Sequence, residues 1–394
     1  MEAVIVSAVR TPLGKFGGSL KDFSAPELGS FAIKGALEKV KDFITVEDID
    51  EVIMGNVLQA GIGQAPARQA ALKSGIPVEV PAVTINKVCG SGLKAVTLAA
   101  QAIKAGDAKI IVAGGQENMS RTPYYLPKAR FGYRYGTGRD AIVDGLEFDG
   151  LREANTGILM GLTGEIVAER NGITRAEADQ FSYRSHQLAI KAQNSGALKD
   201  EIVPITIRTR KESYLLDLDE GPRKDTSVES LARLRPVFKE DGIVTAGNAS
   251  TLNDGAAATI IMERKTAQEL GIEPLATIKA YNSVGVEPNL LMEAPIKGTK
   301  KLFEDLKLTI DDIDVFEHNE AFATASVAVQ KAFNIPDEIF NPRGGAVSLG
   351  HPLGTSGTRI LVTLLSELIR KDGERGLATI CLGGGNAVTI LIER

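Results

Sequence analysis

The chain has few cysteines, few histidines and no tryptophan. Two Cys in 394 residues exclude a scaffold stapled by disulfides. Neither the Cys residues nor the three His residues stand at the spacing of a zinc site, so the sequence predicts no metal. The net charge of −5 and the lack of a long Lys/Arg run argue against a nucleic-acid partner. No stretch of 18 or more apolar residues occurs, so no membrane span is expected.

Other signals are also missing. The chain opens directly on the strand-like residues 3–7 and ends without a peroxisomal tripeptide, so we expect a cytoplasmic protein without a leader. Gly61 and Gly63 are not followed by the third glycine of a dinucleotide fingerprint, and no phosphate loop occurs. We therefore expect neither a nicotinamide enzyme nor a nucleoside-triphosphate enzyme.

The remaining composition is that of an ordinary globular protein, with 43% apolar and 24% charged residues, and its length suits two or three packed units. Glycine is frequent, with 41 residues, which indicates tight turns or close backbone approaches. Short β-branched runs alternate with amphipathic helical stretches, a pattern typical of α/β layers with mixed or parallel sheets. The clearest predicted strands are residues 51–54, 82–85, 109–113, 276–280 and 377–380.

The chain repeats itself once, at about half its length. The first copy has Asp-Ile-Asp-Glu-Val-Ile-Met-Gly-Asn at 48–56, Val-Cys-Gly-Ser-Gly at 88–92 and Ile-Ile-Val-Ala-Gly-Gly at 110–115. The second has Asp-Ile-Asp-Val-Phe-Glu-His-Asn at 312–319, His-Pro-Leu-Gly-Thr-Ser-Gly at 351–357 and Thr-Ile-Cys-Leu-Gly-Gly-Gly at 379–385. Because order and spacing agree within a few residues, we expect two similar halves, each with a sheet.

The pattern changes between about residues 120 and 250. Residues 130–139, rich in Gly and Tyr, and the charged residues 217–225 are typical of loops, whereas residues 175–194 have a helical pattern. An ordered insertion fits this mixture better than a linker. We therefore predict an N-terminal half formed by residues 1–119 and 251–270, an inserted loop domain at 120–250, and a C-terminal half at 271–394.

Both cysteines stand beside glycines. Cys89 lies between a strand-like run and a helix predicted to begin after residues 90–92, where unpaired N–H groups and the helix dipole favour a thiolate. Its small neighbours would admit a substrate and leave N–H groups free as oxyanion donors. Cys381 ends a strand-like run in the equivalent turn of the second half, so we expect both to face one site. A buried, inert thiol is the alternative for each.

Among the histidines, His351 is the functional candidate, because it stands among the small residues of 344–354 rather than in a periodic element. His186 lies on the predicted helix 175–194, where we expect a solvated side chain. His318 adjoins residues 319–322, and we expect it to support that loop rather than to act in catalysis.

These motifs stand in the order of the thiolase family. Residues 88–92, 319–323, 344–357 and 381–385 are similar to the family's motifs, and residues 7–12, 114–120 and 245–250 also match. Over essentially its whole length the chain resembles a thiolase of the acetyl-CoA acetyltransferase type. The resemblance implies a thiolase-like α/β fold of duplicated α-β-α-β-α layered halves with mixed sheets, plus the inserted loop domain.

The resemblance also implies roles for single residues. Cys89 would be the acylated nucleophile, His351 its base, and Cys381 the group that moves the substrate proton. One oxyanion site would be a water on Asn319 together with His351, and the other the backbone N–H groups of Cys89 and Gly383. The expected reaction is the reversible condensation of two acetyl-CoA into acetoacetyl-CoA and CoA through an acyl-cysteine. No cofactor is expected, because coenzyme A is a substrate or product.

The same resemblance implies the binding contacts. At coenzyme A positions it places Arg223, Ser230 and Ser250. At pocket positions it places Phe238, Ala246, Ala321, Phe322, Leu151, Leu159 and Met160. The chain has Leu-Met-Gly at 159–161 in place of His-Met-Gly, and Leu-Met-Glu-Ala-Pro at 291–295 in place of Met-Gly-x-Gly-Pro. A thiolase for longer 3-oxoacyl-CoA, acting in fatty acid degradation, is therefore the close alternative. The family leads us to expect a homodimer or homotetramer.

Two other classes compete with this hypothesis. A decarboxylating ketoacyl synthase would use two His, or His with Asn, in place of the second Cys, so Cys381 argues against it. A non-catalytic lipid carrier or scaffold would be expected to lack one of Cys89, His351 and Cys381, and all three are present.

Overall fold

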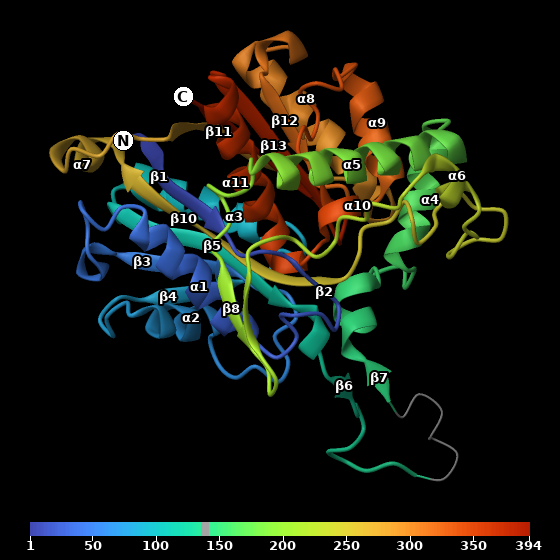
Figure 1. The fold of residues 1–394 in the computed structure, drawn as a ribbon, viewed down its shortest axis with the longest axis horizontal. Helices are drawn as coiled ribbons and strands as arrows, with labels where there is room; N and C mark the ends of the chain where they lie inside the picture. Colours follow the sequence, from blue (N-terminus) through green and yellow to red (C-terminus); the bar gives the residue numbers. More distant parts are fainter. Residues whose placement is uncertain (135–141) are drawn as a thin grey trace.

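The computed structural model describes residues 1–134 and 142–394, so part of the predicted loop at 130–139 lies outside the described residues. Its main feature is a ten-stranded mixed sheet (Figure 1). The strand order is β12 (Val315–His318), β13 (Arg375–Leu382), β14 (Asn386–Glu393), β11 (Ala276–Gly285), β1 (Ala3–Arg10), β10 (Asn253–Glu263), β5 (Ile110–Asn118), β3 (Glu51–Gly55) and β4 (Ala82–Ile85), with β2 (Gly14–Lys15) beside β10.

This sheet consists of two half-sheets that meet at β1 and β11. Two residue pairs join them, Val4 with Thr277 and Ile5 with Ala276. In the first half β3 runs parallel to β4 and β5, and β10 runs antiparallel to β5 and β1. In the second half β12 runs parallel to β13, and β14 runs antiparallel to β13 and β11. The repeated connectivity confirms the predicted class of duplicated α/β halves with mixed sheets.

Helices cover both faces of each half-sheet. The outer layers are α1 (Ala25–Glu38) and α2 (Pro66–Ser74) on the first half, and α8 (Ala294–Leu306) and α9 (Ala323–Phe333) on the second. The middle layer is formed by α3 (Ser91–Ala105) and α11 (Leu353–Lys371), whose apolar side chains share one cluster with the inner faces of both half-sheets. Short helices α7 (Arg264–Glu269), η4 (Pro288–Glu293) and α10 (Ala346–Leu349) complete this body.

The close contact of α3 with α11 depends on glycine. A Cβ on Gly92 would lie 2.5 Å from Thr358 Oγ1, and a Cβ on Gly357 would lie 2.5 Å from the backbone nitrogen of Leu93. Both distances are far shorter than a normal contact, so a larger residue would force the helices apart. These two glycines of the predicted site motifs therefore serve helix packing, and through it they set how near the two halves approach.

The repeated Asp-Ile-Asp motif has a structural role in both halves. Asp48 and Asp312 each close a capping box on the threonine that precedes the short helices η1 (Val46–Asp48) and η5 (Ile310–Asp312). Asp50 and Asp314 each accept two backbone N–H groups at the start of the neighbouring parallel strand, β5 or β13. The motif therefore fixes strand ends and does not reach the candidate site.

The chain makes a long excursion between β5 and β10, where the second half has only the turn at 383–385 between β13 and β14. The excursion contains η2 (Met119–Arg121), β6 (Tyr124–Tyr125), β7 (Val143–Asp144), η3 (Glu147–Leu151), α4 (Met160–Arg170), α5 (Arg175–Ser195), β8 (Ile205–Arg208), β9 (Ser213–Leu216) and α6 (Val228–Ala232). The helix predicted at 175–194 is α5, which Thr174 and Glu177 cap at its start. The limits of the three predicted domains remain a prediction.

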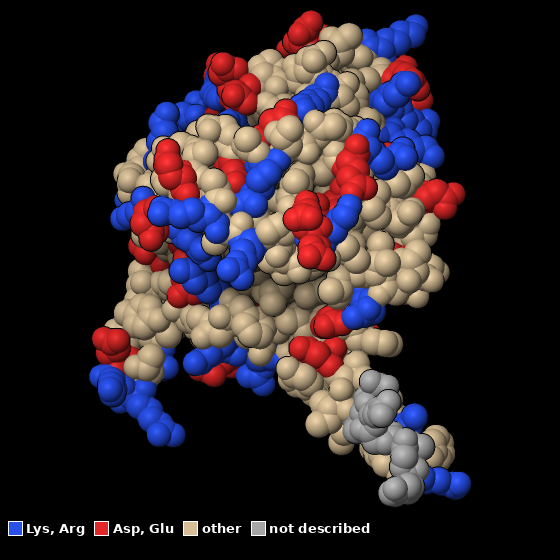
Figure 2. Space-filling model, turned by 90° about the vertical axis from the view of Figure 1, so that its right-hand side faces the viewer, with Lys and Arg blue, Asp and Glu red and all other residues tan. Residues whose placement is uncertain are grey.

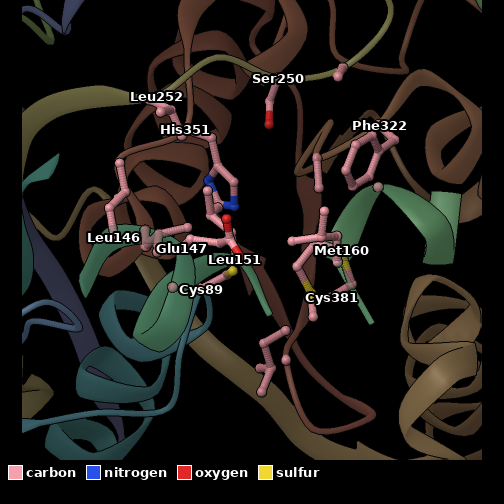
Figure 3. Close-up of a pocket in the computed structure, with 18 of the residues that line it drawn as sticks. Cys89, Leu146, Glu147, Leu151, Met160, Ser250, Leu252, Phe322, His351 and Cys381 are labelled. Atoms are coloured by element: carbon pink, nitrogen blue, oxygen red, sulfur yellow. The ribbon is translucent and has the colours of Figure 1, made fainter. Parts of the chain in front are cut away.

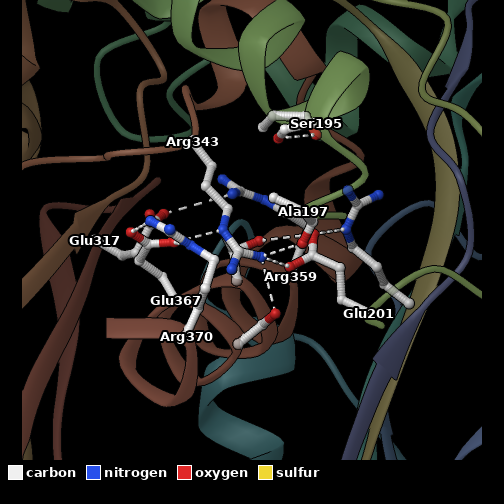
Figure 4. A network of polar contacts seen from close by, with 12 residues as sticks. Ser195, Ala197, Glu201, Glu317, Arg343, Arg359, Glu367 and Arg370 are labelled. Atoms are coloured by element: carbon white, nitrogen blue, oxygen red, sulfur yellow. Dashed lines mark hydrogen bonds and ion pairs between the residues drawn. The ribbon is translucent and has the colours of Figure 1, made fainter. Parts of the chain in front are cut away.

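Buried ion pairs tie the excursion to the body (Figure 4). Glu201 accepts from Arg10 Nε at 2.7 Å and lies 3.2 Å from Arg343 Nη1. Asp219 accepts two bonds from the same Arg10, and Arg343 Nε donates to Glu367 at 2.8 Å. Because each of these buried carboxylates has a guanidinium partner, breaking one pair would leave an uncompensated charge. The excursion is thereby held on β1 and α11.

The surface and the helices bear on possible partners. Basic and acidic side chains are intermixed on the face seen in Figure 2. No helix among the described residues is long and apolar enough to cross a membrane. Within the same residues, no three His, Cys, Asp or Glu side chains gather as a metal site.

Candidate active site

A cavity of about 370 Å³ lies where the two halves meet the excursion (Figure 3). The structure brings the predicted Cys89, His351, Cys381 and Gly383 together in its lining. Seven predicted binding residues also line it, namely Leu151, Leu159, Met160, Phe238, Ser250, Ala321 and Phe322. Asn319 lies behind His351 and is not part of the lining.

Cys89 sits on a strained turn directly before α3, which begins at Ser91 rather than after Gly92 as the sequence predicted. The preceding Val88 has φ of +45°, a left-handed conformation that a β-branched residue rarely adopts and that costs on the order of 1–3 kcal/mol. The turn leaves Cys89 partly exposed to the cavity. Backbone N–H groups of Cys89 and Gly383 both donate toward its sulfur.

Both thiols are protonated in the resting chain. Burial raises the pKa of the Cys89 thiol to about 12; the two N–H groups lower it, and the charge of Glu117 raises it further. Burial and the neighbouring Cys89 also raise the pKa of Cys381. The backbone N–H groups favour the thiolate, as the sequence predicted, but desolvation outweighs them. Each thiol needs a partner that accepts its proton.

His351 is placed to be that partner. Its ring is buried, and Nδ1 lies 2.6 Å from Ser356 Oγ. The single hydroxyl hydrogen of Ser356 goes to the Pro352 carbonyl at 2.8 Å, so Nδ1 must donate and Nε2 keeps its lone pair. Burial lowers the pKa of His351 to about 3, so the ring is a neutral base. Ser356 stands in the predicted motif, yet its role could not be seen without the geometry.

Asn319 is positioned next to this base. It follows β12, its backbone N–H donates to the Thr379 carbonyl at 3.1 Å, and its Nδ2 lies 3.5 Å from His351 Nε2. Its Oδ1 is buried and has no hydrogen-bond partner. Unpaired buried oxygens are rare in folded proteins, so this atom lacks the donor that such an oxygen usually has.

Cys381 ends β13 on the opposite side of the cavity. Its Sγ lies 3.6 Å from the Met292 sulfur and donates toward it. Met292 belongs to η4 and to the segment 291–295, where the sequence differs from the family motif. The sequence analysis did not predict its contact with Cys381. The neighbouring Glu293 bonds Arg170 Nε at 2.9 Å and Asn171 Nδ2 at 3.0 Å and does not line the cavity. The presence of Glu293 in this segment therefore adds no charge to the cavity.

A second cavity of about 580 Å³ adjoins the first and shares Phe238 and Ser250 with it. The predicted Arg223 and Ala246 line it, and so does Lys15, which the sequence reasoning missed. Lys15 follows a Pro-Leu-Gly run, so only the fold shows that it shares a surface with Arg223. Ser230 lines neither cavity; its hydroxyl donates to the Ser227 carbonyl at the start of α6.

The other two histidines are structural. The prediction of a solvated His186 is wrong: it lies on the buried face of α5 with 5% exposure, and its Nδ1 accepts the N–H of Arg223 at 3.1 Å. Burial and Arg223 lower its pKa to about 4. His318 is fully buried, its Nδ1 lies 2.9 Å from Ser326 Oγ, and burial lowers its pKa to about 3.

Comparison with known proteins agrees with this geometry. Residues 3–265 match the family description "Thiolase, N-terminal domain", and residues 272–394 match "Thiolase, C-terminal domain". The chain belongs to the thiolase family. This thiolase is 52% identical to "Acetyl-CoA acetyltransferase" of Escherichia coli, over 99% of this chain and 98% of the relative. It is 50% identical to the protein of that name from Syntrophomonas wolfei, over 100% and 99% of the two chains. It is also 47% identical to a "Probable acetyl-CoA acyltransferase" of Staphylococcus aureus, over 99% and 98%.

The acyl side of the thiolase cavity is apolar. Leu146, Leu151, Leu159 and Met160 line it together with Phe322. Leu159 stands directly before α4 and carries no polar group into the cavity, where the sequence comparison expected a His in acetoacetyl-type members. These apolar side chains suit an uncharged acyl group, and the carboxylates of Asp144 and Glu147 line the same cavity.

Proposed function

We propose that this thiolase is an acetyl-CoA C-acetyltransferase that condenses two acetyl-CoA into acetoacetyl-CoA and CoA through acetyl-Cys89. One observation carries the proposal: Cys89, His351 and Cys381 line one cavity, and two backbone N–H groups meet at the Cys89 sulfur. The names of the relatives from Escherichia coli and Syntrophomonas wolfei support it. Both thiols start protonated and the base starts neutral, so the protons must pass in a fixed order.

In the first half-reaction Nε2 of His351 takes the Cys89 proton as the sulfur attacks the acetyl-CoA carbonyl. The carbon–sulfur bond to CoA breaks, and the CoA thiolate leaves with the proton of Cys381. This step yields acetyl-Cys89, free CoA, an imidazolium and a Cys381 thiolate, and the total charge is unchanged. In this step Cys381 acts as the general acid that protonates the leaving CoA sulfur.

In the second half-reaction the Cys381 thiolate takes a proton from the α-carbon of a second acetyl-CoA. The carbanion attacks the acetyl-Cys89 carbonyl, the carbon–sulfur bond to Cys89 breaks, and His351 returns its proton to that sulfur. Acetoacetyl-CoA leaves, and both thiols are again protonated. The reverse sequence cleaves a 3-oxoacyl-CoA with CoA.

Developing negative charge needs two sets of donors in this scheme. The N–H groups of Cys89 and Gly383 point at the Cys89 sulfur. They would therefore donate hydrogen bonds to the carbonyl oxygen of acetyl-Cys89. A water bound between Asn319 and His351 would meet the enolate oxygen of the second acetyl-CoA. Asn319 Oδ1 lacks the hydrogen-bond donor that such a water would supply.

Coenzyme A would extend from the cavity along the adjoining one. Lys15 and Arg223 supply positive charge there for phosphate groups, and Phe238 and Ser250 stand at the junction of the two cavities. Ser230 supports this surface from α6 instead of lining it.

Mass spectrometry of the intact protein after mixing with acetyl-CoA tests the proposal. Wild-type protein should gain one acetyl group, and Cys89→Ala should gain none at the site. A wild-type chain that forms no acetyl adduct and no acetoacetyl-CoA would sink the proposal.

A 3-oxoacyl-CoA thiolase with a wider chain-length range is the second candidate. The apolar side chains of Leu146, Leu151 and Leu159 favour it, since they would pack against a longer acyl chain. Rates of thiolysis across 3-oxoacyl-CoA of four to sixteen carbons separate the two. A steep preference for four carbons decides for the acetoacetyl type, and a flat profile decides for the wider one.

We further infer from family membership a homodimer or homotetramer in the cytoplasm. Light scattering of the purified chain gives the molecular mass in solution, and a monomer would contradict the first part.

A further inference from the structure

We propose that Glu117 is a positioning residue that holds the turn of the base and the turn of the nucleophile against each other; this rests on the proposed acyl transfer at Cys89. Glu117 belongs to the segment 114–120, which the family resemblance singled out and to which the reaction above assigns no task. It is the next-to-last residue of β5 in the first half and is fully buried.

The Glu117 carboxylate connects three segments by four hydrogen bonds. Oε1 accepts from Asn56 Nδ2 at 2.7 Å and from the Leu58 N–H at 3.2 Å. Oε2 accepts from the Val57 N–H at 3.0 Å and from the Gly354 N–H at 2.8 Å. The first three donors follow β3 of the N-terminal half, and the fourth lies in the first turn of α11 of the C-terminal half. The bridge therefore crosses the junction on which the cavity lies.

Gly354 is the point at which the bridge reaches the base. It follows His351 by three residues, and Pro352 between them fixes one backbone angle. A Cβ on Gly354 would lie 3.0 Å from Glu117 Oε2, so a larger residue would crowd the carboxylate. The hydrogen bond from the Gly354 N–H to Glu117 therefore fixes the position of the segment that contains His351.

The same carboxylate acts on the nucleophile. Within the described residues no Lys or Arg side chain bonds to it, and four N–H groups meet its charge. That charge raises the pKa of Cys89, and burial raises the pKa of Glu117 itself to about 7. The other titratable groups in the cavity that Cys89 lines are His351, Cys381, Asp144 and Glu147. A glutamate with a purely structural role would not change the pKa of Cys89.

The test uses the fact that the chain has two cysteines. In a Cys381→Ser background Cys89 is the sole thiol, and its alkylation by iodoacetamide is followed against pH. Glu117→Gln should lower the midpoint of this profile, because a negative charge that raises the pKa of Cys89 is removed. With Cys381 restored, kcat for acetyl exchange should fall about tenfold or more while KM changes less than about twofold.

Two further variants separate position from charge. Glu117→Asp keeps the charge but is too short for both turns, so kcat should fall while the midpoint stays. Glu165→Gln is the matched control: Glu165 is also buried and accepts the N–H groups of Ile243 and Val244, at 2.8 Å for the latter, and it should leave the midpoint unchanged.

Normal kcat in Glu117→Gln, or a kcat loss without a shift of the midpoint, overturns the proposal. If Glu117→Gln does not fold, Glu117→Asp decides by its kcat, and a wild-type value overturns it. A wild-type chain without any acetyl exchange refutes the proposed function, and the alkylation shift then still reports whether Glu117 acts on Cys89.

Discussion

Replacing Ser356 by alanine should impair His351 more than it impairs the fold. Ser356 Oγ is the sole acceptor that the structure gives for the Nδ1–H of His351, at 2.6 Å, and the ring is buried. Leaving a buried donor without its partner costs about 1–3 kcal/mol. The loss should lie in the upper half of this range during reaction, because the ring then becomes an imidazolium and its bond to Ser356 is charge-assisted. About 2–3 kcal/mol corresponds to a fall in rate of about 30- to 150-fold.

Single-turnover acetylation of the enzyme, followed by the release of CoA, measures this step directly. Ser356→Thr keeps the hydroxyl and should recover most of the rate. Ser326→Ala is a matched control, because Ser326 bonds Nδ1 of the buried His318 at 2.9 Å in the same half of the molecule, outside the cavity. A Ser356→Ala variant that acetylates within about threefold of wild type would show that Ser356 does not set the tautomer of His351.

Three other outcomes are expected. Cys381→Ala should still exchange acetyl groups with CoA slowly but should form no acetoacetyl-CoA, and condensation at the wild-type rate would contradict its role as the acid and base. Met292→Leu removes the sulfur that accepts from Cys381 at 3.6 Å, so condensation should fall about three- to tenfold while acetyl exchange is kept; equal loss in both assays would assign Met292 to packing alone. His186 titrates near pH 4 when folded and near 6.5 when unfolded, so its contribution to stability is complete above about pH 6.5 and is lost as the pH falls toward 4. His186→Asn should therefore lose about 1–2 kcal/mol less than wild type between pH 7 and pH 5 in urea unfolding, and equal losses would contradict a buried neutral His186.

The sequence predicted the duplicated halves because strand periodicity and the repeated motifs are local signals. The predicted strands at 51–54 and 377–380 lie in β3 and β13, and the cavity gathers Cys89, His351 and Cys381 as the repeat suggested. Glycine motifs do not say whether a glycine serves catalysis or packing. Gly92 and Gly357 proved to be contact points of two helices, which no reading of one segment at a time could show.

Burial and long-range pairing were beyond the sequence. A helical pattern gives the faces of α5 but not which face meets the body, so the buried His186 was predicted as solvated. The place of Cys89 before a helix indicated N–H groups that favour its thiolate, whereas the desolvation that outweighs them depends on the whole cavity. Lys15 and Glu117 meet their partners across about two hundred residues of chain, and nothing in their own surroundings marks them.

The asymmetry of the site arises from two small differences between similar halves. The middle-layer helices α3 and α11 have 15 and 19 residues, and both run into β5 or β13 through short connections. The longer helix therefore extends by about one turn at its start. The first turn of α11, which directly follows His351 and Pro352, contacts β5 of the other half through the Gly354 N–H and Glu117. The second difference is the length of one connection. In the C-terminal half β13 and β14 are joined by the glycines at 383–385, whereas in the N-terminal half the corresponding connection, between β5 and β10, is the long excursion that lines the cavity. One half thus contributes Cys89 and the excursion over the cavity, and the other contributes His351, Cys381 and the short turn whose Gly383 N–H points at the Cys89 sulfur.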